Sequence, residues 1–166
     1  DTGLKQTKVY KCAGRAKDLR AICESEKLIT ECGIGHTRWA THGGVNDTNA
    51  HPHQVGKVTL VHNGIIENYR ELIADYELES VLKSETDSEV VAALLNKFYT
   101  GDPDEAIKKT VSKLKGTFAL VILFEDHQGE IYSVRNVSPI VATLCKEGAM
   151  LASDLTALCR FTNRYF

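Results

Sequence analysis

The sequence of 166 residues lacks long apolar segments and any excess of basic charge. No run approaches the ~20 apolar residues that a membrane-spanning helix requires. The first residues also lack the basic stretch and apolar stretch of a secretion signal. Lysine and arginine number 20 against 22 acidic residues, which gives a formal net charge of −2. Proteins that bind nucleic acid usually carry a clustered basic excess. We therefore expect a cytoplasmic domain without membrane or nucleic-acid partners.

The spacing of the cysteines suits neither disulfides nor zinc. The five cysteines are odd in number, widely separated and never form a CxxC pair: Cys12, Cys23, Cys32, Cys145 and Cys159. Disulfide frameworks in small domains use an even number, and zinc sites need closely spaced ligands. We therefore expect reduced thiols, as in a cytosolic protein, and no metal or other cofactor.

Apolar patterning predicts a single α+β domain over residues 1–166. A chain of this length buries roughly 70% of the surface that its unfolded form exposes, so its core needs no disulfides or metal ions for stability. Extended segments are predicted at residues 8–13, 33–39, 57–62, 117–124, 130–134 and 149–152, and after Pro139. Helices are predicted at about 17–26 and from Asn68, Thr86 and Asp102. Because strands flank a block of helices, we expect segregated layers and not alternating βαβ units.

Two of these helices begin with a capping-box pattern. Glu71 stands three residues after Asn68, and Glu89 stands three residues after Thr86. In a capping box, the cap residue and the residue three positions later each accept a hydrogen bond from the other's backbone N–H. Both helix starts are therefore expected to satisfy their own backbone groups.

Polar residues gather between Gly33 and Asn68. This region contains GIGHTRWATHGGVNDTNAHPH and VTLVHNGIIEN, with five of the six histidines and the only tryptophan, Trp39. Polar groups this dense between apolar segments must be hydrogen-bonded or solvated. Binding sites collect such groups, and so do wet surface loops. A tryptophan is usually a core residue because it buries so much area.

The Asn63-Gly64 pair has two interpretations. It is a common two-residue hairpin turn. However, the following IIENYRELI shows no return strand and soon begins a helix, which favours a strand that ends in His-Asn-Gly ahead of a loop. There, glycine permits close approach to its own N–H, and the asparagine amide supplies a second donor. Two donors that converge on one point form an oxyanion hole.

Arg38 and Asp87 each have an ordinary interpretation, as a surface charge and as an acid favoured in the first turn of a helix. Together they match a free amino acid, whose carboxylate suits an arginine fork and whose ammonium suits a carboxylate. Spacing does not show that the two converge. His51 and His53 form an HxH pair that can bind zinc, but no third ligand stands at a recognisable spacing. A metal-dependent hydrolase is thus the lesser alternative.

Seven segments carry a resemblance to a known family. HTRWATHG, NAHPH, HNGIIENY, SETDSE, GTFAL, NVSP and ASDLTAL occur in this order. From about Gly33 to Phe166 the chain resembles the glutaminase domains of class II amidotransferases, in the glucosamine-6-phosphate synthase branch. The Trp after Arg and the HPH segment favour that branch over the phosphoribosyl-transferring one. The resemblance implies a four-layer αββα sandwich of the N-terminal-nucleophile type, with two antiparallel sheets face to face and helices outside.

The resemblance also implies roles in binding glutamine. Arg38 would hold the glutamine carboxylate and Asp87 its amino group. Thr41 and His42 would lie in a loop that closes over the glutamine, and Trp39 beside the route by which ammonia leaves. These roles agree with the chemistry of the residue types.

Catalysis, in this resemblance, depends on an oxyanion hole formed by the Asn63 amide and the Gly64 N–H. The activity implied is hydrolysis of L-glutamine to glutamate, with the ammonia supplied for glucosamine 6-phosphate synthesis from fructose 6-phosphate. The implied partner is a synthase/isomerase domain of the same parent chain, in a homo-oligomer.

One departure from the family concerns the nucleophile. The resemblance implies a cysteine as the first residue, whose own α-amine acts as the base, whereas Asp1 stands there. No internal cysteine has a free α-amine, so we expect residues 1–166 alone to be inactive and incomplete at both ends. A catalytically dead domain that only binds glutamine stays open as an alternative.

Overall fold

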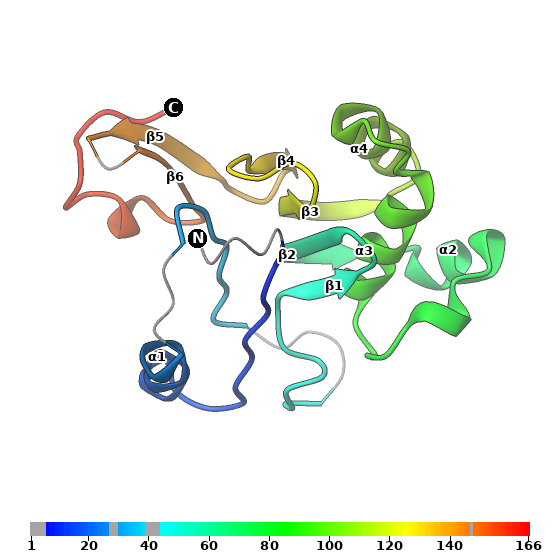
Figure 1. Ribbon diagram of the computed structural model, residues 1–166. Coiled ribbons are helices and arrows are strands. Elements are labelled where there is room, and N and C mark those ends of the chain that lie inside the picture. The colour runs from blue at the N-terminus through cyan, green and yellow to red at the C-terminus, as the bar shows by residue number, and fades with distance from the viewer. Residues whose placement is uncertain (1–5, 27–29, 39–43, 147) are drawn as a thin grey trace.

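The main sheet of the protein is antiparallel and has the strand order β1-β2-β3-β4 (Figure 1). The structure is a computed structural model that describes residues 6–26, 30–38, 44–146 and 148–166. The strands are β1 His53–Val55, β2 Val58–Ile66, β3 Gly116–Phe124 and β4 Tyr132–Asn136. A second antiparallel sheet pairs β5 Val141–Cys145 with β6 Gly148–Ala152.

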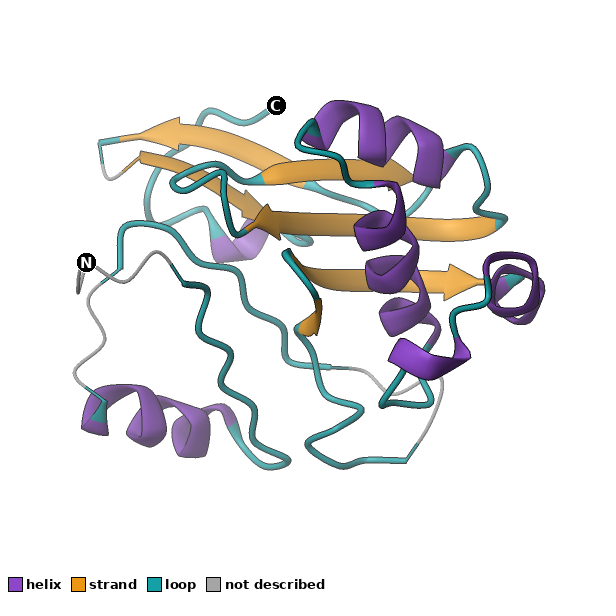
Figure 2. Ribbon diagram, turned by 45° about the vertical axis from the view of Figure 1, so that its right-hand side comes forward, coloured by secondary structure: helices purple, strands orange, loops and turns teal. Residues whose placement is uncertain are grey.

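Helices α2 Tyr69–Tyr76, α3 Asp87–Phe98 and α4 Pro103–Val111 gather on one side of the main sheet (Figure 2). α3 lies against β1 and β2, and α2 and α4 pack against α3. Helix α1, Ala16–Ser25, buries no residue. Single 3-10 turns occupy Glu79–Val81 and Leu155–Ala157. Within the described ranges, no helix is both long and apolar enough to cross a membrane.

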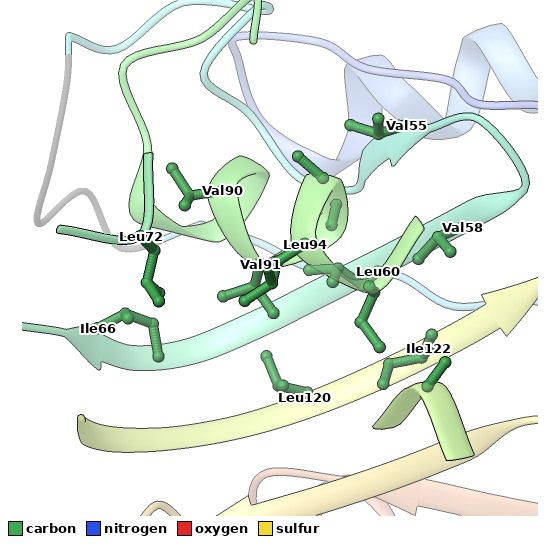
Figure 3. Packing of buried hydrophobic residues seen from close by; sticks show 14 of the residues in the cluster. Val55, Val58, Leu60, Ile66, Leu72, Val90, Val91, Leu94, Leu120 and Ile122 are labelled. Carbon is green, nitrogen blue, oxygen red and sulfur yellow. The ribbon is translucent and has the colours of Figure 1, made fainter. Parts of the chain in front are cut away.

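The core lies between the main sheet and α3. Side chains alternate between the faces of a strand, so the even-numbered residues of β2 and β3 point to α3. Ten of the buried side chains in this cluster are labelled in Figure 3: Val55, Val58, Leu60, Ile66, Leu72, Val90, Val91, Leu94, Leu120 and Ile122. Apolar burial contributes about 25 cal/mol per Å², which makes this face the main source of stability.

Strand β2 is longer than the sequence suggested. The predicted segment 57–62 is extended, but pairing with β3 continues to Ile66, with Gly64 opposite Phe118. The prediction that the strand ends at His-Asn-Gly was therefore wrong, and Asn63-Gly64 is no hairpin turn either. Gly64 has φ +131°, and a Cβ there would stand 2.0 Å from the Thr117 carbonyl oxygen. Only glycine fits, so the residue that looked like a strand end permits close strand pairing.

Two predicted extended segments form no strand among the described residues. Residues 8–13 and 33–38 have irregular backbone. The first segment is instead tied to a loop, since the Lys11 ammonium donates to the Thr48 carbonyl and the Ala13 N–H donates to the Asp47 carboxylate. Alternation over six residues predicts an extended chain, but a strand also needs a neighbouring edge to pair with.

The predicted capping box at Asn68 was wrong. Helix α2 begins after Asn68, but the Asn68 side chain makes no cap hydrogen bond. Its oxygen accepts from the Lys115 N–H at 2.9 Å, and its NH₂ group donates to the Lys113 carbonyl at 2.9 Å. Asn68 therefore connects the start of α2 to Lys113 and Lys115, just before β3. These distant hydrogen bonds replace the expected local cap.

Candidate active site

A cavity of about 280 Å³ opens along the part of β2 that β1 does not cover. β1 pairs only with residues 58–60, so the remaining edge of β2 is open toward other segments. Four residues predicted from the sequence line this cavity: Arg38, Asn63, Gly64 and Asp87. The other three, Trp39, Thr41 and His42, lie outside the described residues.

Asp87 is placed by the start of α3. The Thr86 hydroxyl caps this helix by accepting from the Glu89 N–H at 3.2 Å, as predicted. The other half of the predicted capping box was wrong, because the Glu89 carboxylate accepts from the Lys83 and Ser84 N–H groups and the Thr86 N–H donates to Ser84 Oγ. Asp87 is 3% exposed, and its Oδ2 accepts the Ile66 N–H from the open edge of β2 at 2.8 Å. A carboxylate is favoured at a helix N-terminus because the backbone N–H groups there are unpaired. Asp87 thus presents a fixed negative charge at the cavity.

The open edge of β2 directs backbone N–H groups toward this cavity. The His62 N–H donates to His51 Nδ1 at 3.3 Å, and the Ile66 N–H donates to Asp87. Alternate residues of a strand point their N–H groups to the same side, so Gly64, midway between the two, points its N–H to the same edge. The side-chain amide of Asn63 lies on the residue next to Gly64. Two neutral donors are therefore available side by side at the cavity.

A second cavity, of about 320 Å³, lies on the other side of β2, between the two sheets. Val61 and Val121 of the main sheet and Leu151 of β6 line it with apolar groups. Asn63 lines both cavities. The side chain of Asn63 therefore stands where the polar cavity meets the space between the sheets.

The Arg38 side chain is held by the backbone of Gly44. Its Nη1 donates to the Gly44 carbonyl at 2.9 Å, and its backbone adopts φ +39°. Asn49, which is 2% exposed, donates to the same carbonyl at 3.1 Å and to Glu85 Oε2 at 3.2 Å. The Glu85 N–H donates back to Asn49 Oδ1 at 3.0 Å. Asn49 thus joins Gly44, the residue that the Arg38 side chain contacts, to the segment just before Asp87.

Sequence reasoning missed Asn49 as a site residue. It belongs to the NAHPH segment that carried the family resemblance, so a signal was present. A buried asparagine must satisfy its amide, yet the sequence does not show which backbone groups it meets. Its partners lie as far as 36 positions away along the chain.

The histidines near the cavity are held neutral. The rings of His36 and His51 stack with centroids 4.2 Å apart, and His51 meets His53 edge-on at 4.9 Å. Burial is the main cause that lowers the pKa of His51 to about 2 and that of His53 to about 4. His53 Nε2 lies 3.1 Å from the Thr86 hydroxyl, and His51 Nδ1 accepts from β2. These rings therefore serve as hydrogen-bonding parts of the scaffold.

A metal site is not visible in the part of the chain that the structure describes. No group of three or more His, Cys, Asp or Glu side chains there is arranged to hold a metal ion. His51 Nδ1 and His53 Nε2 are each directed at a hydrogen-bond partner within the protein. The HxH pair thus gives no structural support to a metal-dependent hydrolase.

The sequence profile of a family described as glutamine amidotransferase domain matches residues 36–160. The chain belongs to this glutamine amidotransferase family. The matched range includes every candidate site residue named from the sequence, from Arg38 to Asp87.

Two curated relatives carry the same name, glutamine–fructose-6-phosphate aminotransferase (isomerizing). The protein from Bacillus subtilis is 42% identical over 161 residues, which make up 95% of this chain and 27% of that protein. The protein from Thermus thermophilus is 44% identical over 160 residues, 95% of this chain and 26% of that protein. This amidotransferase chain thus spans about a quarter of the length of the curated relatives that it matches.

A solved structure also resembles this amidotransferase chain. The glutamine phosphoribosylpyrophosphate amidotransferase from B. subtilis, complexed with ADP and GMP, matches 75% of this chain and 28% of its own with a TM-score of 0.62. At 24% identity this likeness shows the fold alone. It confirms the predicted fold class at the level of a mixed domain of helices and two antiparallel sheets.

Proposed function

We propose that this chain binds L-glutamine and forms the glutaminase part of an enzyme that uses the released ammonia to convert fructose 6-phosphate into glucosamine 6-phosphate. The observation that carries the proposal is the single cavity shared by Arg38, Asn63, Gly64 and Asp87. The names of the relatives support the acceptor sugar and the coupled isomerisation. Because the relatives are about four times longer, we assign the sugar to another domain of the same polypeptide.

Glutamine would be oriented by charges at both ends of its backbone. The Arg38 guanidinium suits its carboxylate, since a planar fork makes two parallel hydrogen bonds. The buried Asp87 carboxylate suits its ammonium. With both groups held, the side-chain amide of glutamine reaches toward Asn63 and Gly64 on β2. The Asn49 hydrogen bonds support this mode of binding because they connect Gly44, which the Arg38 side chain contacts, to Glu85, close to Asp87.

Attack of a thiolate on the glutamine amide turns the carbonyl oxygen into an oxyanion. The Asn63 NH₂ group and the Gly64 N–H would donate to this oxygen and lower the barrier. The leaving nitrogen takes up the proton that the thiol gave to its base, so that collapse of the tetrahedral adduct releases ammonia and leaves a thioester. Water then hydrolyses the thioester to glutamate and the free thiol. This chain's described groups supply the binding and the oxyanion donors of that sequence.

The thiolate is not one of the cysteines named above. All five are free and lie in the described residues, and none lines the cavity. We therefore propose that these five cysteines take no part in catalysis. The second candidate function is a domain that binds glutamine without hydrolysing it. The free thiols also agree with the reducing cytoplasm as the compartment.

Calorimetric titration of the chain with matched ligands tests the binding proposal. L-Glutamine should bind more tightly than glutaramate, which lacks the ammonium, and than 4-aminobutanamide, which lacks the carboxylate. Equal affinity for all three would overturn the proposed site. Release of glutamate by the intact natural protein that contains residues 1–166 separates the candidates. Turnover supports the amidotransferase, and binding without turnover supports the binding-only domain.

A further inference from the structure

We propose that His36 is a positioning residue that holds the Asn63 amide with its NH₂ group available to the cavity. This inference rests on the proposed function, because it deepens the role of Asn63 as an oxyanion donor. An asparagine amide presents an oxygen on one side and an NH₂ group on the other. An oxyanion hole works only if the NH₂ group faces the reacting oxygen. A neighbouring group must therefore fix which of its two orientations the Asn63 amide adopts.

The tautomer of His36 is set by a backbone group. The Arg38 N–H donates to His36 Nδ1 at 2.8 Å. A backbone N–H is only a donor, so Nδ1 carries no proton, and the proton of the neutral ring resides on Nε2. Burial lowers the pKa of His36, and the nearby Arg38 charge lowers it further, although the contact with Asn63 opposes this. The neutral Nε2–H form is therefore the favoured one.

This tautomer determines the orientation of Asn63. His36 Nε2 lies 2.7 Å from Asn63 Oδ1, so the ring N–H donates to the amide oxygen. The reverse flip would place the Asn63 NH₂ group against the ring N–H, two donors facing each other. The bond thus turns the amide oxygen toward His36 and leaves the NH₂ group for another acceptor.

The ring of His36 is itself held by a stacking contact. It stacks on His51 with centroids 4.2 Å apart, and His51 is in turn bonded to the backbone of β2 at His62. The backbone that fixes the tautomer belongs to Arg38, the proposed partner of the glutamine carboxylate. One short chain of contacts therefore joins Arg38, which would bind the glutamine carboxylate, to Asn63, the proposed oxyanion donor.

Two substitutions separate the hydrogen bonds of His36. In His36→Asn, the amide oxygen can accept from the Arg38 N–H, but the side chain is too short to reach Asn63. In His36→Gln, the NH₂ group is long enough to donate to Asn63. In the intact natural protein, kcat for glutamate release should fall about tenfold in His36→Asn, with KM within about twofold, because the lost interaction acts in the transition state. His36→Gln should recover part of that loss.

A double-mutant cycle distinguishes positioning from simple packing. If His36 acts through Asn63, adding His36→Asn to Asn63→Ala should change kcat by less than about twofold. His127→Asn is the matched control, since His127 follows β3 and lines neither cavity, and it should leave kcat unchanged. Fully additive losses, or no loss in His36→Asn, would overturn the positioning role.

Nitrogen NMR of the unmodified chain gives a readout that needs neither folding of a variant nor activity. The ¹⁵N shifts of His36 should show a protonated Nε2 and an unprotonated Nδ1. A proton on Nδ1 would overturn the inference even if Asn63→Ala abolishes turnover. Conversely, an unimpaired Asn63→Ala enzyme would overturn the proposed function, while the tautomer of His36 would still be seen. The two failures are thus distinguishable.

Discussion

The two sides of the main sheet differ in what they bury. The side that faces α3 is filled by aliphatic side chains such as Leu60 and Ile122, both 0% exposed. The open edge of β2 and the opposite face are hollowed by two cavities of about 280 and 320 Å³, and Asn63 lines both. The same strand therefore contributes to stability on one side and presents polar groups on the other. Substitutions on the two sides should separate stability from activity.

Ile122→Ala should have the largest effect, and it should act on stability. Ile122 lies on the α3 side, and removing a buried aliphatic side chain leaves a cavity that typically costs about 2–5 kcal/mol. Urea unfolding should therefore show a much lower free energy of unfolding. Leu144→Ala is the control, because Leu144 is 70% exposed and should change stability by less than about 0.5 kcal/mol. An equally small loss at Ile122 would mean that the α3 side is not the main core.

Asn63→Ala should act on activity and not on stability. Loss of one oxyanion donor costs on the order of 10²–10³ in kcat, about 2.7–4 kcal/mol, with little change in glutamine affinity. Steady-state rates of glutamate release by the intact natural protein, together with urea unfolding, measure both quantities. An enzyme with normal kcat and a raised KM would make Asn63 a binding residue and not an oxyanion donor.

Acid should destabilise the protein through the buried rings of His51 and His53. The pKa values of His51 and His53, about 2 and about 4, lie below the ordinary value of 6.5. Below pH 6.5 the unfolded chain binds protons that the folded chain excludes, so the free energy of unfolding falls as pH falls. The loss is at most about 1.4 kcal/mol per pH unit for each ring, down to about pH 4 for His53.

Urea unfolding at about pH 7.5, 6.5 and 5.5 measures this slope. The double variant His51→Gln, His53→Gln should flatten the slope below pH 6.5, the ordinary pKa of the ring. An unchanged slope in the double variant would show that other groups cause the acid sensitivity.

Sequence patterns predicted those elements whose defining residues are close together in the sequence. The cap at Thr86 is confirmed by its bond to the Glu89 N–H, and the cap at Asp102 by its bond to the Glu105 N–H. The apolar run at residues 117–124 is a strand, as expected. Each of these predictions depends on residues only a few positions apart.

Predictions failed where distant groups compete with local ones. Asn68 bonds to residues about 45 positions away instead of capping α2. Of the site, the sequence named Arg38, Asn63, Gly64 and Asp87, and their approach to one cavity is visible only in the fold. Asp87 reaches the cavity because α3 lies against β2. The supporting residue His36 was missed because one histidine among five in that region looks like any other until its ring contacts are known.

Arg38→Lys should have the smallest effect of the four changes, and it tests binding alone. The charge is kept, but lysine is a point charge on a flexible stem and cannot form the two parallel bonds of the arginine fork. The Arg38 side chain also donates to the Gly44 carbonyl, and a lysine ammonium can still reach such an acceptor. We expect glutamine affinity to fall about tenfold, or ~1.4 kcal/mol, with the free energy of unfolding nearly unchanged.

The control for this change is Arg20→Lys. Arg20 lies on α1 in an exposed pair with Glu24 and does not line the cavity, and such pairs contribute little. Calorimetric titration should show unaltered glutamine affinity in Arg20→Lys and a weaker affinity in Arg38→Lys, with glutaramate affinity reduced in parallel because it carries the same carboxylate. If Arg38→Lys instead unfolds at lower urea but binds glutamine normally, Arg38 stabilises its loop through Gly44, and the carboxylate is bound elsewhere in the cavity.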